Sequence, residues 1–205
     1  MDYAGTFPAL VPSNVLYADL VRRSTNAKGN TMYRTIAAAV CVAGLTSAGA
    51  IAAPAAKPTD PQIAHIAYTA DQLDIEAGKQ ALDKSNNQDV RAFAQRMVGD
   101  HTAVNDQALA LVKKLNVTPE DNSTSQSLTQ AADAERTKLA GLDGASFDKA
   151  YVDNEVAYHK TVNEALSKTL IPDAQNAELK SLLERGLTLF QSHQHHAETL
   201  AKRLH

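Results

Sequence analysis

Residues 90–115 read VRAFAQRMVGDHTAVNDQALALVKKL. Along this stretch, apolar or small side chains and one histidine recur at intervals of three and four residues: Val90, Ala94, Met97, His101, Val104, Ala108, Leu111 and Leu115. Because an α-helix has about 3.6 residues per turn, these side chains share one face. An alternation of this length is typical of a helix in a bundle. We expect the helix to end at Asn116, before Pro119.

Three other long stretches have the same periodicity. Asp60-Pro61 combines an N-cap residue with a proline at the first helical position, which predicts a helix over residues 60–84. Ser146 is expected to cap a helix over residues 147–170, and a turn at Pro172-Asp173 leads into a last helix over residues 174–204. The long connection between the second and third helices contains a short amphipathic segment at residues 128–139. Two helical hairpins joined in this way predict an all-α, ferritin-like four-helix bundle with a short extra helix in the long crossover.

Composition narrows the classes of function. The chain has 205 residues, 44% of them hydrophobic but only 5% aromatic, which favours close-packed helices over β-sheet. The net charge of −3 and the interspersed signs argue against binding of nucleic acid, which needs a basic face. No glycine-rich phosphate loop and no nucleophile motif is present, so no catalytic residue is nominated and an enzyme is not expected.

The N-terminal part has the features of an export signal. Arg34 precedes an apolar run over residues 36–51, and Ala50-Ile51-Ala52 matches a cleavage site, so residues 32–52 are predicted to be a signal peptide. The run is shorter than the roughly 20 residues that a spanning helix needs, which favours cleavage over a membrane anchor. Residues 1–31 are then an upstream extension that is either not translated, with Met32 as the initiator, or disordered.

Removal of residues 1–52 defines the expected mature protein. Residues 53–59 form a linker and residues 60–205 form the bundle. Cys41 would be lost, which excludes disulfides, thiolate metal sites and cysteine catalysis. The predicted location is the periplasm, with a possible outer-membrane association and no stable membrane insertion after cleavage.

Polar residues within the apolar faces mark a candidate site. His101 and His193 occupy core positions, and His159 lies one turn after Glu155. At about 1.5 Å per residue, Asp74, Glu76, His101 and His159 reach similar heights, whereas His193 comes out nearer one end, which leaves open that it belongs to a second feature. The candidate metal ligands are Asp74, Glu76, Asp100, His101, Glu155, His159 and His193.

Imidazole and carboxylate ligands suit a divalent transition metal such as Zn or Cu, or Ni. Ferritin-like di-iron proteins carry Glu-x-x-His on two helices. Here the nearest pattern is Glu155-x-x-x-His159, which argues against ferroxidase-like activity. The alternative is that each histidine is buried, neutral and hydrogen-bonded without a metal. In the run 193–196, His195 and His196 are expected to face solvent, and with His205 they could bind metal adventitiously; His65 has no obvious partner.

Four stretches carry a family resemblance. They are LDIEAGKQAL (73–82), VRAFAQRMVGDH (90–101), FDKAYVDNEVAYH (147–159) and LTLFQSHQHHAETL (187–200). Over residues 60–205 the chain resembles the bacterial domain-of-unknown-function 4142 family, whose members are ferritin-like, exported and often labelled outer-membrane proteins. The resemblance implies the fold and export, but no established reaction.

The family pattern also implies which positions are special. It has an acidic residue, usually Glu, where Asp74 stands, Asp-His at Asp100-His101, and histidines at His159 and His193. Two departures are the shorter Asp74 and Thr188, where proline is common.

Two functions follow as expectations. The first is an exported, non-enzymatic bundle that acts in metal binding or envelope stress through the mid-bundle site. The second is a structural bundle, or one that binds an unknown protein partner, with no metal.

Overall fold

The computed structural model describes residues 57–204. The predictions for the upstream extension, the signal peptide, Cys41, most of the linker and His205 therefore concern residues outside the described range.

The described chain consists of helices joined by short loops and contains no strand between residues 57 and 204. Its elements are α2 (Asp60–Lys84), α3 (Gln88–Leu115), α4 (Ser123–Ala140), α5 (Gly144–Ala165), the π-helical turn η1 (Leu166–Leu170), α6 (Ile171–Asp173) and α7 (Ala177–Arg203). The predicted all-α, ferritin-like architecture is confirmed.

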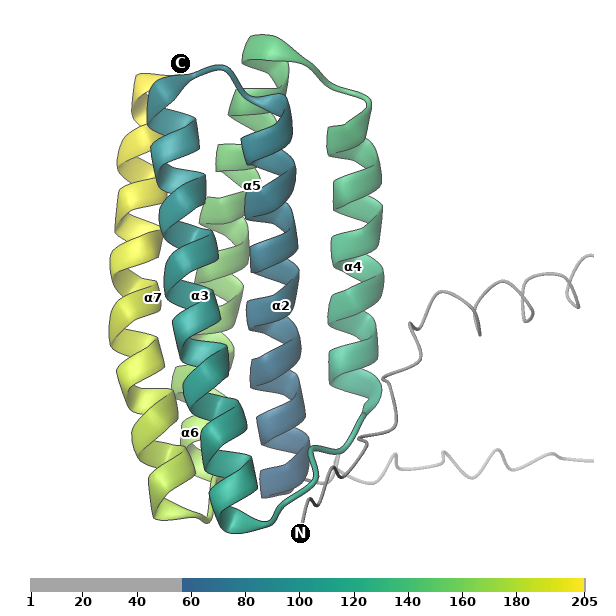
Figure 1. Ribbon diagram of the computed structural model, residues 1–205, viewed down its shortest axis with the longest axis vertical. Coiled ribbons are helices and arrows are strands. Elements are labelled where there is room, and N and C mark those ends of the chain that lie inside the picture. The colour runs from purple at the N-terminus through teal and green to yellow at the C-terminus, as the bar shows by residue number, and fades with distance from the viewer. Residues whose placement is uncertain (1–56, 205) are drawn as a thin grey trace, which may run out of the picture. The chain divides into compact units, whose positions relative to one another are not determined.

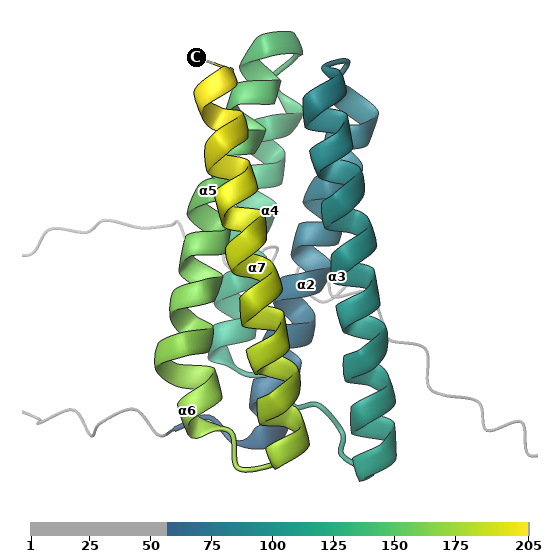
Figure 2. The same cartoon turned by 90° about the vertical axis from the view of Figure 1, so that its left-hand side faces the viewer.

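Four long helices form the bundle (Figures 1 and 2). The hairpin α2–α3 packs against the hairpin α5–α7, so that α2 contacts α3 and α5, and α7 contacts the same two helices. The fifth helix, α4, runs along the outside of the bundle beside α2 and carries the chain back to the end at which α2 finishes. As a result, α3 and α5 run parallel, as expected for a ferritin-like course.

Side-chain caps set most of the helix starts. The Asn87 side chain accepts hydrogen bonds from the backbone N–H groups of Asp89 and Val90, and Asn116 ends α3 in the left-handed conformation. Asn122 caps α4 in the same manner, so the crossover helix has 18 residues and is longer than the segment 128–139 that periodicity predicts. Its Ser/Thr-rich first turns have no apolar stripe, which is why the pattern alone leaves them outside the helix.

Two further boundaries differ from prediction. α5 begins at Gly144, which has a φ of +54° that glycine adopts without strain, so Ser146 lies within the first turn and is not the cap. α7 begins at Ala177, three residues later than predicted, because the Asn176 side chain accepts from the N–H groups of Glu178 and Leu179.

Pro172 does not start the turn between the last two helices. The helix continues through η1 and α6, and the chain turns at Ala174, where the backbone becomes extended. Proline lacks an N–H and its ring crowds the carbonyl one turn earlier, and widening of the preceding turn to a π-helix accommodates both effects.

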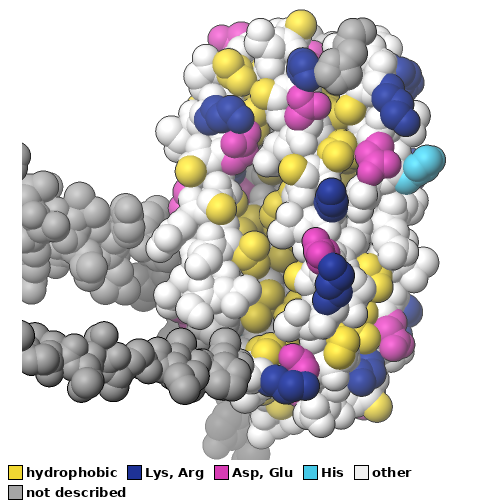
Figure 3. Space-filling view, turned by 180° about the vertical axis from the view of Figure 1, so that it is seen from behind, with side chains coloured by type: hydrophobic (Ala, Val, Ile, Leu, Met, Phe, Trp, Pro, Cys, Tyr) yellow, Lys and Arg dark blue, Asp and Glu magenta, His cyan; other side chains and the backbone are white. Residues whose placement is uncertain are grey.

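The hydrophobic core consists of two clusters, one toward each end of the bundle. One is built around Phe93, Phe147 and Tyr151, and the other around Ile63, Leu166 and Leu183. The face seen in Figure 3 carries Lys or Arg interspersed with Asp or Glu, with hydrophobic side chains set back between the helices. Within residues 57–204, no helix is both long and apolar enough to cross a membrane.

Candidate metal centre

A layer of buried polar side chains separates the two apolar clusters. On α2 it lies between Ile66 and Ala77, and on α3 it follows Met97. The layer contains the fully buried side chains of Asp71, Asp74, His101, Glu155, His159 and His193, with exposures of 1–4%. Each of the four long helices contributes one or two of these residues, so the four helices meet in a shared polar centre.

Three imidazoles converge in this layer. The ring centroids of His101, His159 and His193 lie 5.3–5.6 Å apart, and one ring nitrogen of each lies within 4.8 Å of the others. His193 therefore lies in the same centre as His101 and His159, and the alternative that it belongs to a second feature nearer one end of the bundle is wrong. The later start of α7 accounts for the difference, since three residues correspond to about 4.5 Å along the axis.

Each imidazole is held through one nitrogen. His101 donates through Nδ1 to Asp71 Oδ1 at 2.6 Å, and His193 donates through Nε2 to Asp100 Oδ2 at 2.9 Å. His159 donates through Nδ1 to the backbone carbonyl of Glu155 at 3.0 Å. These roles follow from the acceptors, since a carboxylate or carbonyl oxygen leaves the ring nitrogen as the donor.

When a ring is neutral, its second nitrogen carries a lone pair that can bind a cation. His101 Nε2, His159 Nε2 and His193 Nδ1 are buried and have no hydrogen-bond partner among the described residues. A carboxylate or carbonyl behind an imidazole fixes its tautomer and orientation, which is the usual outer support of a metal-binding histidine. All three rings have this support.

Two carboxylates approach the imidazoles. Asp74 Oδ2 lies 2.7 Å from His101 Nε2 and 3.4 Å from His159 Nε2, but neither Asp74 oxygen has a partner with hydrogen-bond geometry within residues 57–204. Glu155 Oε2 lies 3.5 Å from His159 Nδ1 and is likewise unpartnered there. Asp74, Glu155 and His159 form a second set of three ligand atoms within 4.8 Å of one another.

Burial and mutual charge determine the protonation of these groups. Burial by itself would lower the pKa of His101, but Asp74 and Asp71 outweigh it and raise the pKa to about 10. Burial would raise the pKa of Asp74, yet the charge on His101 lowers it to about 2. The pKa of Glu155 is raised well above its ordinary value by burial and by the charge of Asp74.

The other two imidazoles are neutral near pH 7. Burial lowers the pKa of His159, and it lowers the pKa of His193 to about 4 despite the hydrogen bond to Asp100. In the absence of a metal, His101 is therefore an imidazolium beside an ionised Asp74, and burial together with the charge of Asp74 favours the protonated form of Glu155. The charges of His101 and Asp74 offset each other, and a bound metal ion would take the place of the extra His101 proton.

Two predicted residues do not reach the centre as ligands. Glu76 forms an ion pair with Arg136 of α4, because two residues beyond Asp74 the helix has turned its side chain toward the outer helix. Asp100 is partly exposed and holds His193 from outside. Of the other histidines, His195 is exposed, His196 packs edge-on against Phe93, and His65 lies 3.9 Å from Asp121.

Sequence reasoning missed Asp71. It lies three residues before Asp74 and shares its helix face, and this i,i+3 pair of acids beside the apolar positions Ala70 and Leu73 is the signal that could have identified it. Phe190 of α7 stacks on the His101 ring at 4.6 Å between centroids. It closes one side of the centre with hydrocarbon.

A comparison with known protein families shows to which family the chain belongs. The family described as "Domain of unknown function (DUF4142)" matches residues 45–200. The chain belongs to DUF4142. The resemblance found in the four sequence stretches is thereby confirmed. This DUF4142 protein places Asp74, His101, His159 and His193 in one buried layer of the bundle.

One solved structure supports the fold. A DUF305 protein from Streptomyces coelicolor, which its description assigns provisionally as secreted, has a TM-score of 0.60 with 15% sequence identity. The alignment covers 70% of this chain and 91% of that one. None of the curated proteins compared with the chain matches it in sequence.

Proposed function

We propose that this DUF4142 protein is an exported helical bundle that binds one divalent transition metal ion, Zn or Cu, through His101, His159 and His193 with Asp74. The observation that carries the proposal is the arrangement of the imidazoles. Each ring is held from behind by an oxygen acceptor and has one buried nitrogen without a hydrogen-bond partner among the described residues. One ring nitrogen of each histidine lies within 4.8 Å of those of the other two.

The donor set fits such an ion. Three neutral imidazoles and one carboxylate suit Zn or Cu(II), whereas an all-oxygen set would suit Mg or Ca. Burial of unpartnered polar atoms costs free energy, and coordination to a cation would recover it. Metal binding would displace the proton of His101, because a ring nitrogen coordinates only when it is deprotonated.

Export is supported by the sequence features of residues 32–52. A role in the periplasm under metal or envelope stress is consistent with a bundle that has no nominated catalytic residue. N-terminal sequencing of the protein recovered from the periplasmic fraction tests this part. A mature N-terminus near residue 53 is expected, and an N-terminus at Met1 in the cytoplasmic fraction would contradict it.

Metal titration of tag-free protein tests the site. We expect one equivalent of Zn or Cu to bind and to raise the Tm, with His101→Ala abolishing both effects. His195→Ala is the matched control, since His195 is exposed on α7 and should leave binding unchanged. If no first-row metal shifts the Tm of the wild-type protein, the metal site is wrong.

One observation favours a second candidate, a structural or partner-binding bundle without metal. His101 already lies between Asp71 and Asp74 at 2.6 and 2.7 Å, so its imidazolium form is paired with carboxylates without any ion. Such buried pairs can fix the register of a bundle at little net gain in stability. This candidate predicts that His101→Leu folds with an unchanged or higher Tm and that metals have no effect on either protein.

A further inference from the structure

A pocket on the side of the bundle reaches the candidate centre. It lies between α2, α4 and α5, has a volume of about 250 Å³, and is lined by Asp74 and Glu155 together with apolar side chains such as Ala77, Ala132 and Ala157. Of the four proposed metal ligands, only Asp74 lines it. The pocket therefore approaches the centre from its carboxylate side.

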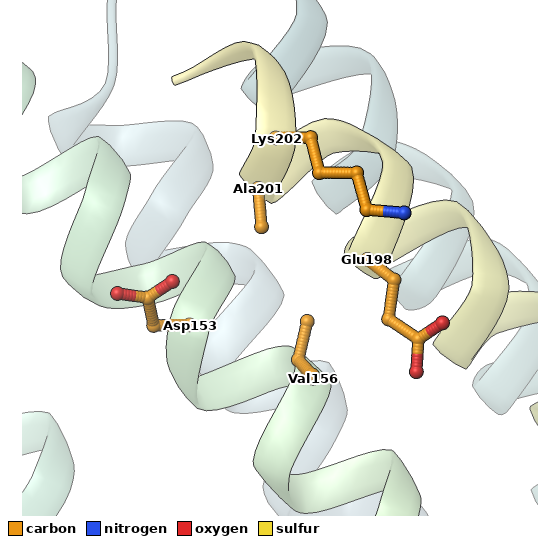
Figure 4. A pocket seen from close by; sticks show the side chains of 5 residues that line it. All are labelled: Asp153, Val156, Glu198, Ala201 and Lys202. Carbon is orange, nitrogen blue, oxygen red and sulfur yellow. The ribbon is translucent and has the colours of Figure 1, made fainter. Parts of the chain in front are cut away.

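A second hollow provides a contrast. It lies between α5 and α7 and is lined by Asp153, Val156, Glu198, Ala201 and Lys202, with Ala201 and Val156 facing each other across it (Figure 4). Its volume, about 280 Å³, is similar, but none of its lining residues belongs to the polar layer.

Helix α4 forms the outer wall of the first pocket. Its only fully buried residues are Ser125 and Leu139, near its two ends, and the small side chains of Ala131 and Ala132 face the pocket between them. Polar contacts hold its second half on α2: Gln80 Nε2 donates to the Arg136 carbonyl at 3.0 Å, and Glu76 pairs with the Arg136 side chain. The pocket is thus a gap under a helix that is fixed at both ends.

The centre contains two overlapping sets of three potential ligand residues, and only one of the sets includes residues that line this pocket. The outer set is Asp74, Glu155 and His159, and the inner set is His101, His159 and His193. His159 belongs to both sets, and Asp74 Oδ2 lies 2.7 Å from His101 Nε2 of the inner set. The pocket is therefore lined by two residues of the outer set and by no residue of the inner set.

Building on the proposed function, we propose that Asp74, Glu155 and His159 form an outer metal position that receives a hydrated divalent cation from the pocket and passes it to the three imidazoles. Both carboxylates are buried, both line the pocket, and both have oxygen atoms without a hydrogen-bond partner in the described chain. Carboxylate oxygens suit hard, hydrated cations, whereas imidazoles favour Zn and Cu, and Glu155 would release its proton when it binds the ion. A cation entering from the pocket would therefore bind first at the outer set and then be retained more selectively by the three imidazoles.

Stopped-flow metal uptake and chelator-driven release test the path. Ala132→Phe should fill the pocket and slow both uptake and release by about tenfold, a change in barrier of ~1.4 kcal/mol, with Kd unchanged because the ligands are intact. Ala201→Phe fills the unrelated hollow of Figure 4 and should leave both rates as in wild type. His193→Ala should instead weaken Kd.

Glu155→Gln is a second, independent test of the outer metal position that does not depend on filling the pocket. It removes a ligand of the outer set only, so it should slow uptake of Zn or Cu(II) while Kd for the inner site changes much less than in His193→Ala. Unchanged uptake rates in both Ala132→Phe and Glu155→Gln would overturn the outer position but leave the inner site standing. Absence of any metal binding by wild type would instead overturn the proposed function.

Discussion

Protonation of His101 predicts how the free energy of unfolding of the metal-free protein depends on pH. The folded state raises the pKa of His101 from an ordinary value of about 6.5 to about 10, because Asp74 and Asp71 flank the buried ring. Between these two values the folded protein binds a proton that the unfolded chain has lost. The free energy of unfolding must therefore decrease as the pH rises from about 6.5 toward 10.

The size of the effect follows from linkage. One proton corresponds to about 1.4 kcal/mol per pH unit, so the contribution of His101 between pH 7 and 9.5 is at most about 3 kcal/mol. This is a large fraction of a typical total stability of about 5–15 kcal/mol. The raised pKa of Glu155 acts in the same direction, so a variant is needed to isolate His101.

Urea unfolding in the presence of a chelator measures this decrease at pH 7, 8.5 and 9.5. The measurements stop at pH 9.5 because tyrosines of the unfolded chain ionise at about pH 10. Burial raises the pKa values of Tyr151 and Tyr158 well above 10 in the folded state, so their titration would otherwise add to the effect of His101. His101→Gln removes the titrating group, and we expect it to be less stable at pH 7 with a shallower pH dependence. A wild-type stability that is flat from pH 7 to 9.5, or equal slopes in the two proteins, would refute the assignment of the proton to His101.

Three further predictions concern neighbouring features. Asp71→Asn keeps the shape but weakens the acceptor behind His101, so metal affinity should fall by about 10–100-fold in a titration while the circular dichroism spectrum is retained. A Cβ at Gly78 would lie 2.9 Å from Val98 Cγ2, so Gly78→Ala should lower the free energy of unfolding by about 1–3 kcal/mol. A Cβ at Gly99 meets open space, so Gly99→Ala should raise the free energy of unfolding by up to ~1 kcal/mol. Equal effects of the two changes in urea unfolding would contradict the close approach of α2 and α3. Because burial lowers the pKa of His193 to about 4, its neutral form is favoured in the folded state, and the stability of the metal-free protein should fall as the pH decreases from about 6.5 to 4, checked by thermal unfolding.

Local periodicity is sufficient for most of the fold and for the inward direction of the histidines. The alternation of three and four residues around Met97 and His101 specifies which face of α3 is buried, whatever that face contacts. The same reasoning places His159 and His193 in the interior. It is less informative where a helix has no apolar stripe, as in the first turns of α4, since only the Asn122 cap marks the start there.

The sequence by itself determined the helices, their buried faces and the family, because these depend on side-chain spacing within one segment. Only the tertiary structure decided which acids serve the histidines: Asp71 and Asp74 face the centre, whereas Glu76 faces Arg136 on α4. It also decided that His193 lies level with His101, because that depends on where α7 begins and how it packs against α3. Distances between helices depend on the packing of whole segments, and a shift of one turn, about 5.4 Å, separates a shared site from unrelated side chains.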